Sequence, residues 1–260
     1  MSNKIKSKIR KSTPKLVKST IGSVACNPFF GRLISWYYND KIPYGKNKIC
    51  TESSLIDSSS KASLFWNRYE VAEARFIEKY LSSQNNVVEL GGGIGAISCK
   101  ILEKIGPNNK LIVVEANVGI VETARSNIRN NYPGSNCFVL NRAICEPDEN
   151  AAKFREGEKI VSGTTNRLEE EGISVDCISV EKLSKMVNKE YSLVSDIEGG
   201  EMHFIMSSVR LNKCTEIIIE LHEGYYKGSY ISEKYMIKKI VQKGFSLVDK
   251  HGPVCVFKRD

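Results

Sequence analysis

Short apolar runs alternate along the chain with amphipathic stretches of helical period, from about Tyr69 onward. The runs predict strands at 86–90, 110–115, 137–140, 192–196, 215–220, 245–249 and 253–257. The stretches between them predict helices at 94–105, 118–130, 181–189, 201–210 and 231–243, after a first helix that begins near Tyr69. Near-continuous apolar strands separated by helices are typical of a parallel sheet that is buried on both faces.

The last two apolar runs are joined by only a few residues, too few for a crossover between parallel strands. They therefore predict an antiparallel hairpin at the C-terminal end of an otherwise parallel sheet. The long connection 145–191 predicts two additional strands, at 159–163 and 175–180. The expected fold class is α/β, a mostly parallel seven-stranded sheet with helices on both faces.

Residues 1–60 lack this alternation. They are expected to form a basic N-terminal arm and loops, partly disordered, ahead of a catalytic domain at 61–260. The net charge of +8 arises in this arm, because residues 1–38 hold eight Lys and Arg residues and no acid. This basic, acid-free arm is expected to be a solvated tail, and contact with an anionic membrane surface or another polyanion is the alternative. The remaining chain is electrically neutral, so it gives no strong signal for nucleic-acid binding.

Composition and cysteine usage narrow the class of protein. With 41% hydrophobic and 26% charged residues the chain is globular, which excludes collagen-like and wholly disordered classes. Its eight cysteines occur singly, without a C-x-x-C pair, so they predict neither a zinc module nor a disulfide framework. We therefore expect a cytoplasmic protein, with the basic arm as the means of any peripheral contact with a membrane. The sequence does not predict the oligomeric state.

The strongest local motif is VVELGGGIGAIS at 87–98, a strand, a glycine cluster and the start of a helix. Gly91, Gly93 and Gly95 allow a tight turn and the close approach of a ligand to the backbone. The helix that follows offers free N–H groups and the positive end of its dipole. Glu115 ends the next strand, where its carboxylate is placed to accept both hydrogen bonds from a ribose diol.

Two cofactors fit this turn. The dinucleotide pattern G-x-G-x-x-G/A is matched by Gly91, Gly93 and Ala96, with Glu115 as the ribose acid. Sites for S-adenosylmethionine use a similar turn with an acid two residues before the first glycine, and Glu89 supplies that acid. The motif alone leaves both cofactors open, as well as a turn made only for packing.

Several segments occur in the order found in one enzyme family. They are YE at 69–70, VVELGGGIG at 87–95, VVEAN at 113–117, SNIRNN at 126–131, NRAI at 141–144, VSDIEGGE at 194–201 and IIIELHE at 217–223. In these segments the chain resembles the FkbM-type family of S-adenosylmethionine-dependent methyltransferases. DIEGGE is similar to the D-x-E-G-x-E signature of that family. GGGIG departs from it, because such proteins often carry G-A-N-x-G there.

The resemblance implies a class I, Rossmann-like methyltransferase fold. It also implies methyl transfer from S-adenosylmethionine to a hydroxyl of a sugar, a glycan or another small-molecule acceptor. Residues of this chain take cofactor-binding roles by the same resemblance. Glu89, Gly91, Gly93 and Gly95 would line the methionine part, Glu115 would hold the ribose, Asn117 would lie beside the adenosine, and Asn141 and Ala143 would flank the adenine.

Polar residues follow two of the predicted strands and are expected at one edge of the sheet. They are Asp196, Glu198, Glu201, Glu220 and His222. By the resemblance Asp196 faces the transferred methyl group, and either Asp196 or His222 is the candidate general base, with Glu198 as a further catalytic candidate. His222 and the acids also fit structural roles. Asp196, Glu198 and His222 carry oxygen and imidazole ligands that suit Mg²⁺ or Mn²⁺, which leaves a metal site as an alternative. No metal-ligand spacing motif is present, so no metal is predicted.

Two other enzyme classes remain as alternatives. An NAD(P)-dependent oxidoreductase with a Rossmann domain would use the same glycine turn, but its Tyr-x-x-x-Lys pair matches only Tyr230 and Lys234, far from a useful position. A nucleic-acid methyltransferase is suggested by the basic arm, but the N/D-P-P-Y/F loop is replaced by DIEGG. A non-catalytic relative is disfavoured by the presence of Glu89, Glu115 and Asp196.

Overall fold

The computed structural model describes residues 26–149, 151–154 and 173–260. The chain forms two compact units, Met1–Tyr69 and Glu70–Asp260. The expected partly disordered part of the arm lies largely outside the described residues. In the described part, no helix has the length and hydropathy needed to cross a membrane.

The described part of the N-terminal unit consists of two helices and a hairpin. They are α3 (Pro28–Tyr38), β1 (Lys41–Tyr44), β2 (Asn47–Cys50) and α4 (Ser58–Phe65). Asn27 and Asp57 cap the two helices by accepting hydrogen bonds from backbone N–H groups of their first turns. The prediction of loops in this region is therefore wrong, because Asn27 and Asp57 satisfy the first backbone N–H groups and allow helices to begin there. The unit extends to Tyr69 rather than to residue 60.

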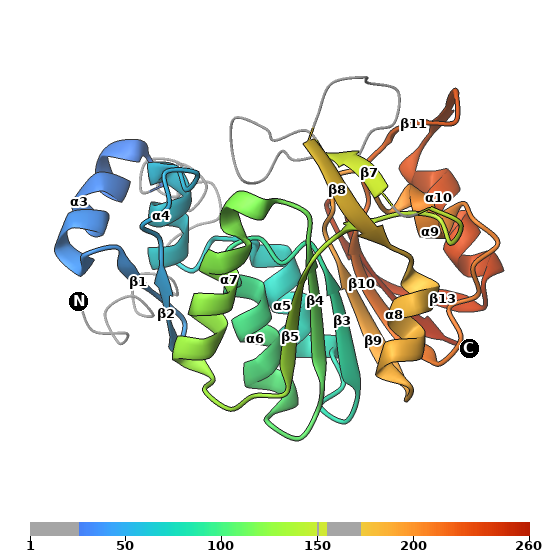
Figure 1. Cartoon of the computed structure of the whole chain (residues 1–260), viewed down its shortest axis with the longest axis horizontal. Coiled ribbons are helices and arrows are strands. Elements are labelled where there is room, and N and C mark those ends of the chain that lie inside the picture. The colour runs from blue at the N-terminus through green and yellow to red at the C-terminus, as the bar shows by residue number, and fades with distance from the viewer. Residues whose placement is uncertain (1–25, 150, 155–172) are drawn as a thin grey trace. The chain divides into compact units, whose positions relative to one another are not determined.

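The larger unit is built on a seven-stranded sheet in the order β13-β14-β10-β9-β3-β4-β5 (Figure 1). The strands are β3 (Asn86–Leu90), β4 (Leu111–Glu115), β5 (Cys137–Asn141), β9 (Tyr191–Ser195), β10 (Cys214–Glu220), β13 (Phe245–His251) and β14 (Val254–Arg259). Only β14 breaks the parallel arrangement, pairing antiparallel with both β10 and β13. The predicted α/β fold, with its C-terminal antiparallel hairpin, is confirmed.

Helices cover both faces of this sheet. They are α5 (Val71–Tyr80), α6 (Ala96–Ile105), α7 (Val118–Asn131), α8 (Val180–Val187), α9 (Met202–Ile205) and α10 (Glu233–Gln242). The first three lie on one face, and α8 and α10 lie on the other (Figure 1). Alternate strand residues such as Val88 and Leu193 join α8, α9 and α10 in a continuous apolar core. Helix α9 is shorter than predicted, since only 202–205 are helical.

A smaller sheet of β6 (Ala143–Ile144), β7 (Ala151–Phe154) and β8 (Ile173–Ile178) follows the seven-stranded sheet along the chain. Strand β8 corresponds to the strand predicted at 175–180, whereas the one predicted at 159–163 lies outside the described residues. A short hairpin of β11 (Gly224–Tyr226) and β12 (Ser229–Ile231) was not predicted. Both additions form sheets of their own and leave the seven-stranded sheet intact.

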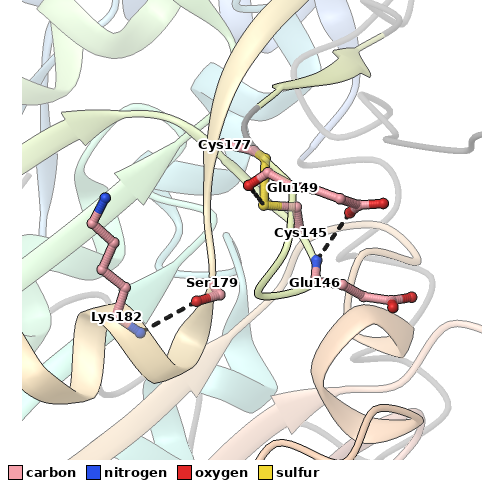
Figure 2. The surroundings of a disulfide bond; sticks show 6 residues. All are labelled: Cys145, Glu146, Glu149, Cys177, Ser179 and Lys182. Atoms are coloured by element: carbon pink, nitrogen blue, oxygen red, sulfur yellow. Dashed lines mark hydrogen bonds between the residues drawn. A yellow bond between two sulfur atoms is a disulfide. The ribbon is translucent and has the colours of Figure 1, made fainter.

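A disulfide joins Cys145 to Cys177, with a Cα–Cα distance of 5.8 Å (Figure 2). The two cysteines meet because β6 and β8 pair in parallel, with Ala143 opposite Cys177. The bond lies just before Ser179, which caps α8 (Figure 2). The sequence predicts no disulfide framework and so gives no signal for this bond, and cysteine usage no longer argues for a reducing compartment.

Candidate functional site

The residues predicted for the site follow strands that end at the same edge of the sheet. In the parallel ladders Leu90 pairs with Ser195 and Val114, and Glu115 pairs with Asn141. Ser195 also pairs with Ile219 of β10. The loops after these strands therefore meet at the carboxyl edge, where ligands bind in open α/β sheets.

The glycine turn crosses this edge with almost no space between its backbone and the loop after β9. Gly91 has a left-handed φ of 89°, and a Cβ there would lie 1.8 Å from the carbonyl oxygen of Asp196. Gly95 begins α6 at φ 77°, where a Cβ would lie 3.0 Å from the carbonyl oxygen of Ala124. Glycine is required at both positions, because other residues would combine backbone strain with a steric clash.

Glu115 fastens the glycine turn to the start of α7. Its Oε2 atom accepts a 2.7 Å hydrogen bond from the Gly93 N–H, and its Oε1 atom accepts one of 2.8 Å from the Asn117 N–H. Burial raises the pKa of Glu115, and the backbone hydrogen bonds oppose that shift. Each carboxylate oxygen has a second lone pair, so Glu115 can still accept hydrogen bonds from a diol.

The other residues predicted on the adenosine side lie near Glu115, where they contribute to the structure of the chain itself. They are Asn117, Asn141 and Ala143. Asn117 caps α7 by accepting a 2.8 Å hydrogen bond from the Gly119 N–H. The Asn141 side chain donates hydrogen bonds of 2.9 and 3.1 Å to the carbonyls of Glu115 and Ala116. Ala143 is buried in β6. Asn141 therefore fixes the end of β4, and its predicted role beside the adenine stays a prediction.

Glu89 is a buried carboxyl group close to the Ser98 hydroxyl, which opposes the rise of its pKa. Its residue is 1% exposed, and neither carboxylate oxygen has a hydrogen-bond partner among the described residues. Burial, together with the negative charge of Glu115, raises the pKa of Glu89 to about 8. An unpaired buried carboxyl is costly as an anion, so its ionised form needs a cation nearby. A cationic ligand at the glycine turn would meet that need.

His222 lies among four carboxylates. Its Nδ1 atom is 3.2 Å from Oε1 of Glu201. Its Nε2 atom is 3.4 Å from Oε2 of Glu198, 3.7 Å from Oε1 of Glu220 and 3.9 Å from Oδ1 of Asp196. The structure thus brings together the residues that the sequence placed after the two strands, with the imidazole at their centre.

Glu201 orders the loop that carries two of these carboxylates. Its side chain is fully buried, Oε1 accepts a 3.0 Å hydrogen bond from the Ile197 N–H, and Oε2 accepts one of 2.9 Å from the Gly199 N–H. The same Oε1 contacts His222, so one carboxylate fixes both the loop and the imidazole.

The charges around His222 determine its protonation. Burial alone would lower its pKa, but the hydrogen bond to Glu201 and the charges of Glu201, Asp196 and Glu198 outweigh it and raise the pKa of His222 to about 9. The imidazole is therefore a cation at neutral pH. In the described part of the chain, this imidazole forms ion pairs with four carboxylates, those of Asp196, Glu198, Glu201 and Glu220.

Two acids at the start of α5 join the cluster and were not identified as site residues. Burial and the charges of Glu220 and Glu198 raise the pKa of Glu70 to about 7. Burial, then the charge of Asp196, raises the pKa of Glu73 well above its ordinary value. The sequence held one signal for the burial of Glu73, because this carboxylate shares a helical stripe with the apolar Phe76 and Ile77, which are also buried.

Two sets of these side chains are close enough to share a cation. Ligand atoms of Asp196, Glu198 and His222 lie within 4.8 Å of one another, as do those of Glu70, Asp196 and Glu220. Oxygen and imidazole ligands suit Mg²⁺ or Mn²⁺, although acidic groups at such distances are common without a metal. The sequence-based expectation of no metal stays a prediction.

No protein-family model and no curated protein matches the sequence. Among solved structures, a magnesium protoporphyrin IX methyltransferase from Synechocystis PCC 6803 with bound S-adenosylmethionine is similar over 94% of this chain and 97% of that chain, at 9% identity and a TM-score of 0.43. A methyltransferase from Aquifex aeolicus dependent on S-adenosylmethionine is similar over 72% and 87%, at 13% identity and a TM-score of 0.41. Fibrillarin from Aeropyrum pernix is similar over 72% and 73%, at 12% identity and a TM-score of 0.42. At these scores the likeness by itself says nothing of the reaction catalysed.

Proposed function

We propose that the protein is an S-adenosylmethionine-dependent methyltransferase that acts on an acceptor hydroxyl. The supporting observation is the sign of the charge at the carboxyl edge of the sheet. The carboxyl groups that gather there are Glu70, Glu73, Glu89, Glu115, Asp196, Glu198, Glu201 and Glu220. S-adenosylmethionine carries a sulfonium and an ammonium, which these groups attract, whereas the pyrophosphate of a dinucleotide would be repelled.

The residues at the glycine turn suit this cofactor. Glu89 is a buried carboxyl at the strand end, and a cation nearby would lower its raised pKa and stabilise its charge. Glu115 keeps free lone pairs for the two ribose hydroxyls while its backbone contacts hold the turn rigid. When bound, the cofactor supplies an electrophilic methyl group.

In the proposed reaction Asp196 accepts the proton of the acceptor hydroxyl. Burial and the charges of Glu70 and Glu220 raise the pKa of Asp196 well above its ordinary value, whereas the charge of His222 lowers it. Ionised beside the imidazolium, Asp196 would be a stronger base than an exposed aspartate. Oδ1 of Asp196 is buried and lacks a hydrogen-bond partner in the described residues, so its capacity to accept a hydrogen bond is unused there. The bound cofactor would supply the methyl group to the acceptor oxygen, and the proton released from that oxygen would pass to Asp196.

In this proposal His222 is not the general base, although its position in the sequence made it a candidate for that role. With a pKa of about 9 it already holds a proton at neutral pH, so it is a poor general base there. As a cation 3.9 Å from Asp196 it stabilises the carboxylate form of that residue. His222 is therefore a positioning and charge-balancing residue, and Glu198 supports its charge from 3.4 Å.

The finer assignment to the FkbM type, with a sugar or glycan hydroxyl as the acceptor, rests on the DIEGGE motif. In this chain the motif has a defined structural purpose, because its last residue is Glu201, which fixes the loop and orients His222. A motif whose ends are Asp196 and Glu201 thus combines the proposed base with the residue that organises the base's surroundings.

Thermal melting with S-adenosylhomocysteine and, separately, with NADH tests the cofactor. A ligand at about 100 times its dissociation constant stabilises the native state by about 2.7 kcal/mol, which is visible as a raised Tm. We expect a shift with S-adenosylhomocysteine alone. A shift with NADH alone would overturn the proposal and favour a dehydrogenase.

The reaction is tested by measuring S-adenosylhomocysteine formed from S-adenosylmethionine with a panel of free sugars and methyl glycosides. Asp196→Asn is expected to lower the rate by about 10²-fold or more while the Tm shift with S-adenosylhomocysteine is kept. Glu190→Gln, an exposed change ahead of the same strand, serves as the matched control. Unchanged turnover in Asp196→Asn would remove Asp196 as the base.

A further inference from the structure

Helix α3 of the N-terminal unit presents an apolar, mainly aromatic face to solvent. Its exposed large side chains are Phe29 at 62%, Phe30 at 40%, Leu33 at 47%, Trp36 at 81% and Tyr37 at 71%. At about 100° per residue, these positions fall within an arc of about 120° on the helix surface. A contiguous stripe of this kind differs from the scattered exposed hydrophobics that are normal on protein surfaces.

The stripe is not needed to hold α3 in its own unit. The opposite side of the helix packs on α4, where Gly31 is buried and a Cβ would lie 1.7 Å from the carbonyl oxygen of Ser58. The rings of Tyr38 and Phe65 are also in contact there, with centroids 5.6 Å apart. The aromatic face is thus free for a partner outside the described part of this unit.

The charge of the neighbouring sequence indicates the kind of partner. Arg32 lies on α3, seven further Lys and Arg residues occur between Lys4 and Lys18, and the first acid of the chain is Asp40. Asp40 is itself paired with Lys61 at 2.6 Å. The seven basic residues between Lys4 and Lys18 lie outside the described residues, so only their charge and their place in the sequence enter the inference.

We propose that α3 lies on an anionic membrane surface. Its aromatic stripe enters the headgroup boundary, while Arg32 and the basic residues 4–18 bind the acidic headgroups. Trp, Tyr and Phe on one face of a helix are the side chains that favour this boundary. Stable peripheral binding takes two signals, and this unit offers an apolar stripe together with a polybasic segment. Binding to a nucleic acid would account for the basic segment, but it would not account for the exposed aromatic stripe.

Co-sedimentation of the full chain with vesicles tests the proposal. Vesicles of phosphatidylcholine alone are compared with vesicles containing about one third phosphatidylserine, at low and high salt. We expect binding only to the anionic vesicles and a loss of at least tenfold in affinity at high salt, because screening weakens the basic contribution. Equal binding to neutral vesicles, or no binding to either, would overturn it.

Variants separate the two contributions. Phe29→Ser with Trp36→Ser is expected to weaken binding to anionic vesicles at least tenfold, and so is deletion of residues 2–18. Tyr235→Ser with Leu247→Ser provides the matched control, because these side chains are 40% and 41% exposed on the other unit. Both double variants change exposed residues, so their Tm values should match that of the wild type.

The same variants identify other occupants of the stripe. If the wild type sediments as a dimer and Phe29→Ser with Trp36→Ser makes it monomeric without affecting vesicle binding, a second copy covers α3 and the proposal fails. If that variant keeps full vesicle binding and only the deletion loses it, the basic segment is a general polyanion contact and α3 has no part in it. The Tm shift with S-adenosylhomocysteine is independent of either result.

Discussion

The Nδ1 atom of His222 lies 3.2 Å from Oε1 of Glu201. The Glu201 side chain is fully buried, and its carboxylate also accepts hydrogen bonds from two backbone N–H groups. Because Glu201 cannot turn away without losing these bonds, the imidazole is held with its other nitrogen toward Glu198, Glu220 and Asp196. The contact therefore sets both the direction and the charge of His222.

Glu201→Gln should lower the pKa of His222 from about 9 toward its ordinary value of 6.5, because the strongest stabilising contact of the imidazolium loses its charge. The chain has only three histidines, so NMR titration of their ring protons can follow this residue directly. Glu181→Gln, on the exposed side of α8, is the matched control and should leave the titration unchanged. An unshifted pKa in Glu201→Gln would contradict the contact.

The free energy of unfolding is expected to fall as pH rises from about 6.5 to 9. The pKa of His222 is raised in the folded state, so its contribution is complete below pH 6.5 and is lost as pH passes 9. Glu89 acts in the same direction between pH 4.5 and 8, because only the unfolded chain releases its proton readily there. Urea denaturation at pH 6, 7.5 and 9 measures the slope.

His222→Gln should make that slope shallower, with a change of order 2 kcal/mol across the interval. His251→Gln, an exposed substitution in the β13–β14 hairpin, should leave the slope as it is in the wild type. A slope that is equally steep in both variants would assign the pH dependence to other groups.

Gly91→Ala should destabilise the larger unit by about 3 kcal/mol or more, since it adds a severe clash with the Asp196 carbonyl to an unfavourable left-handed φ. Gly134→Ala separates the two effects. Gly134 has a φ of 78°, but a Cβ there meets nothing within 4 Å, so only the backbone cost of about 1 kcal/mol applies. Equal losses of Tm in the two variants would mean that the loop after β9 moves aside.

Glu115→Gln should weaken binding of S-adenosylhomocysteine at least tenfold, as measured by calorimetry. The amide would turn one N–H donor toward the backbone N–H groups of Gly93 or Asn117, which loosens the turn as well as removing a ribose acceptor. Glu122→Gln, whose side chain is 75% exposed on α7, is the control. Undiminished affinity in Glu115→Gln would place the ribose elsewhere.

Replacing both Cys145 and Cys177 by Ser should lower the free energy of unfolding by about 2–4 kcal/mol, because the unfolded chain gains conformational freedom. A reducing agent should lower the Tm of the wild type by a similar amount and leave that of the double variant unchanged. Cys137→Ser, at a free and partly exposed thiol, is the control. A wild-type Tm that does not respond to reduction would contradict the disulfide.

The sequence was sufficient for the main sheet and the glycine turn, because strand periodicity and the spacing of Gly91, Gly93 and Gly95 are local properties. It also placed Asp196 and His222 at one edge, since parallel strands end together. It was insufficient for Glu73, whose burial depends on what α5 packs against, and for Cys145 and Cys177, which meet only through the pairing of β6 with β8. The helix α3 was missed because its length and caps are modest signals beside a strongly charged arm.

The bond between Cys145 and Cys177 also gives the chain a second covalent route past residues 146–176. The covalent connection between the glycine turn and the His222 loop consequently does not depend on any peptide bond in that interval. A single cut by a protease there would yield a nicked molecule that runs as one band without a reductant and as two bands with one. Such a nicked form could retain both halves of the proposed site in one covalent unit.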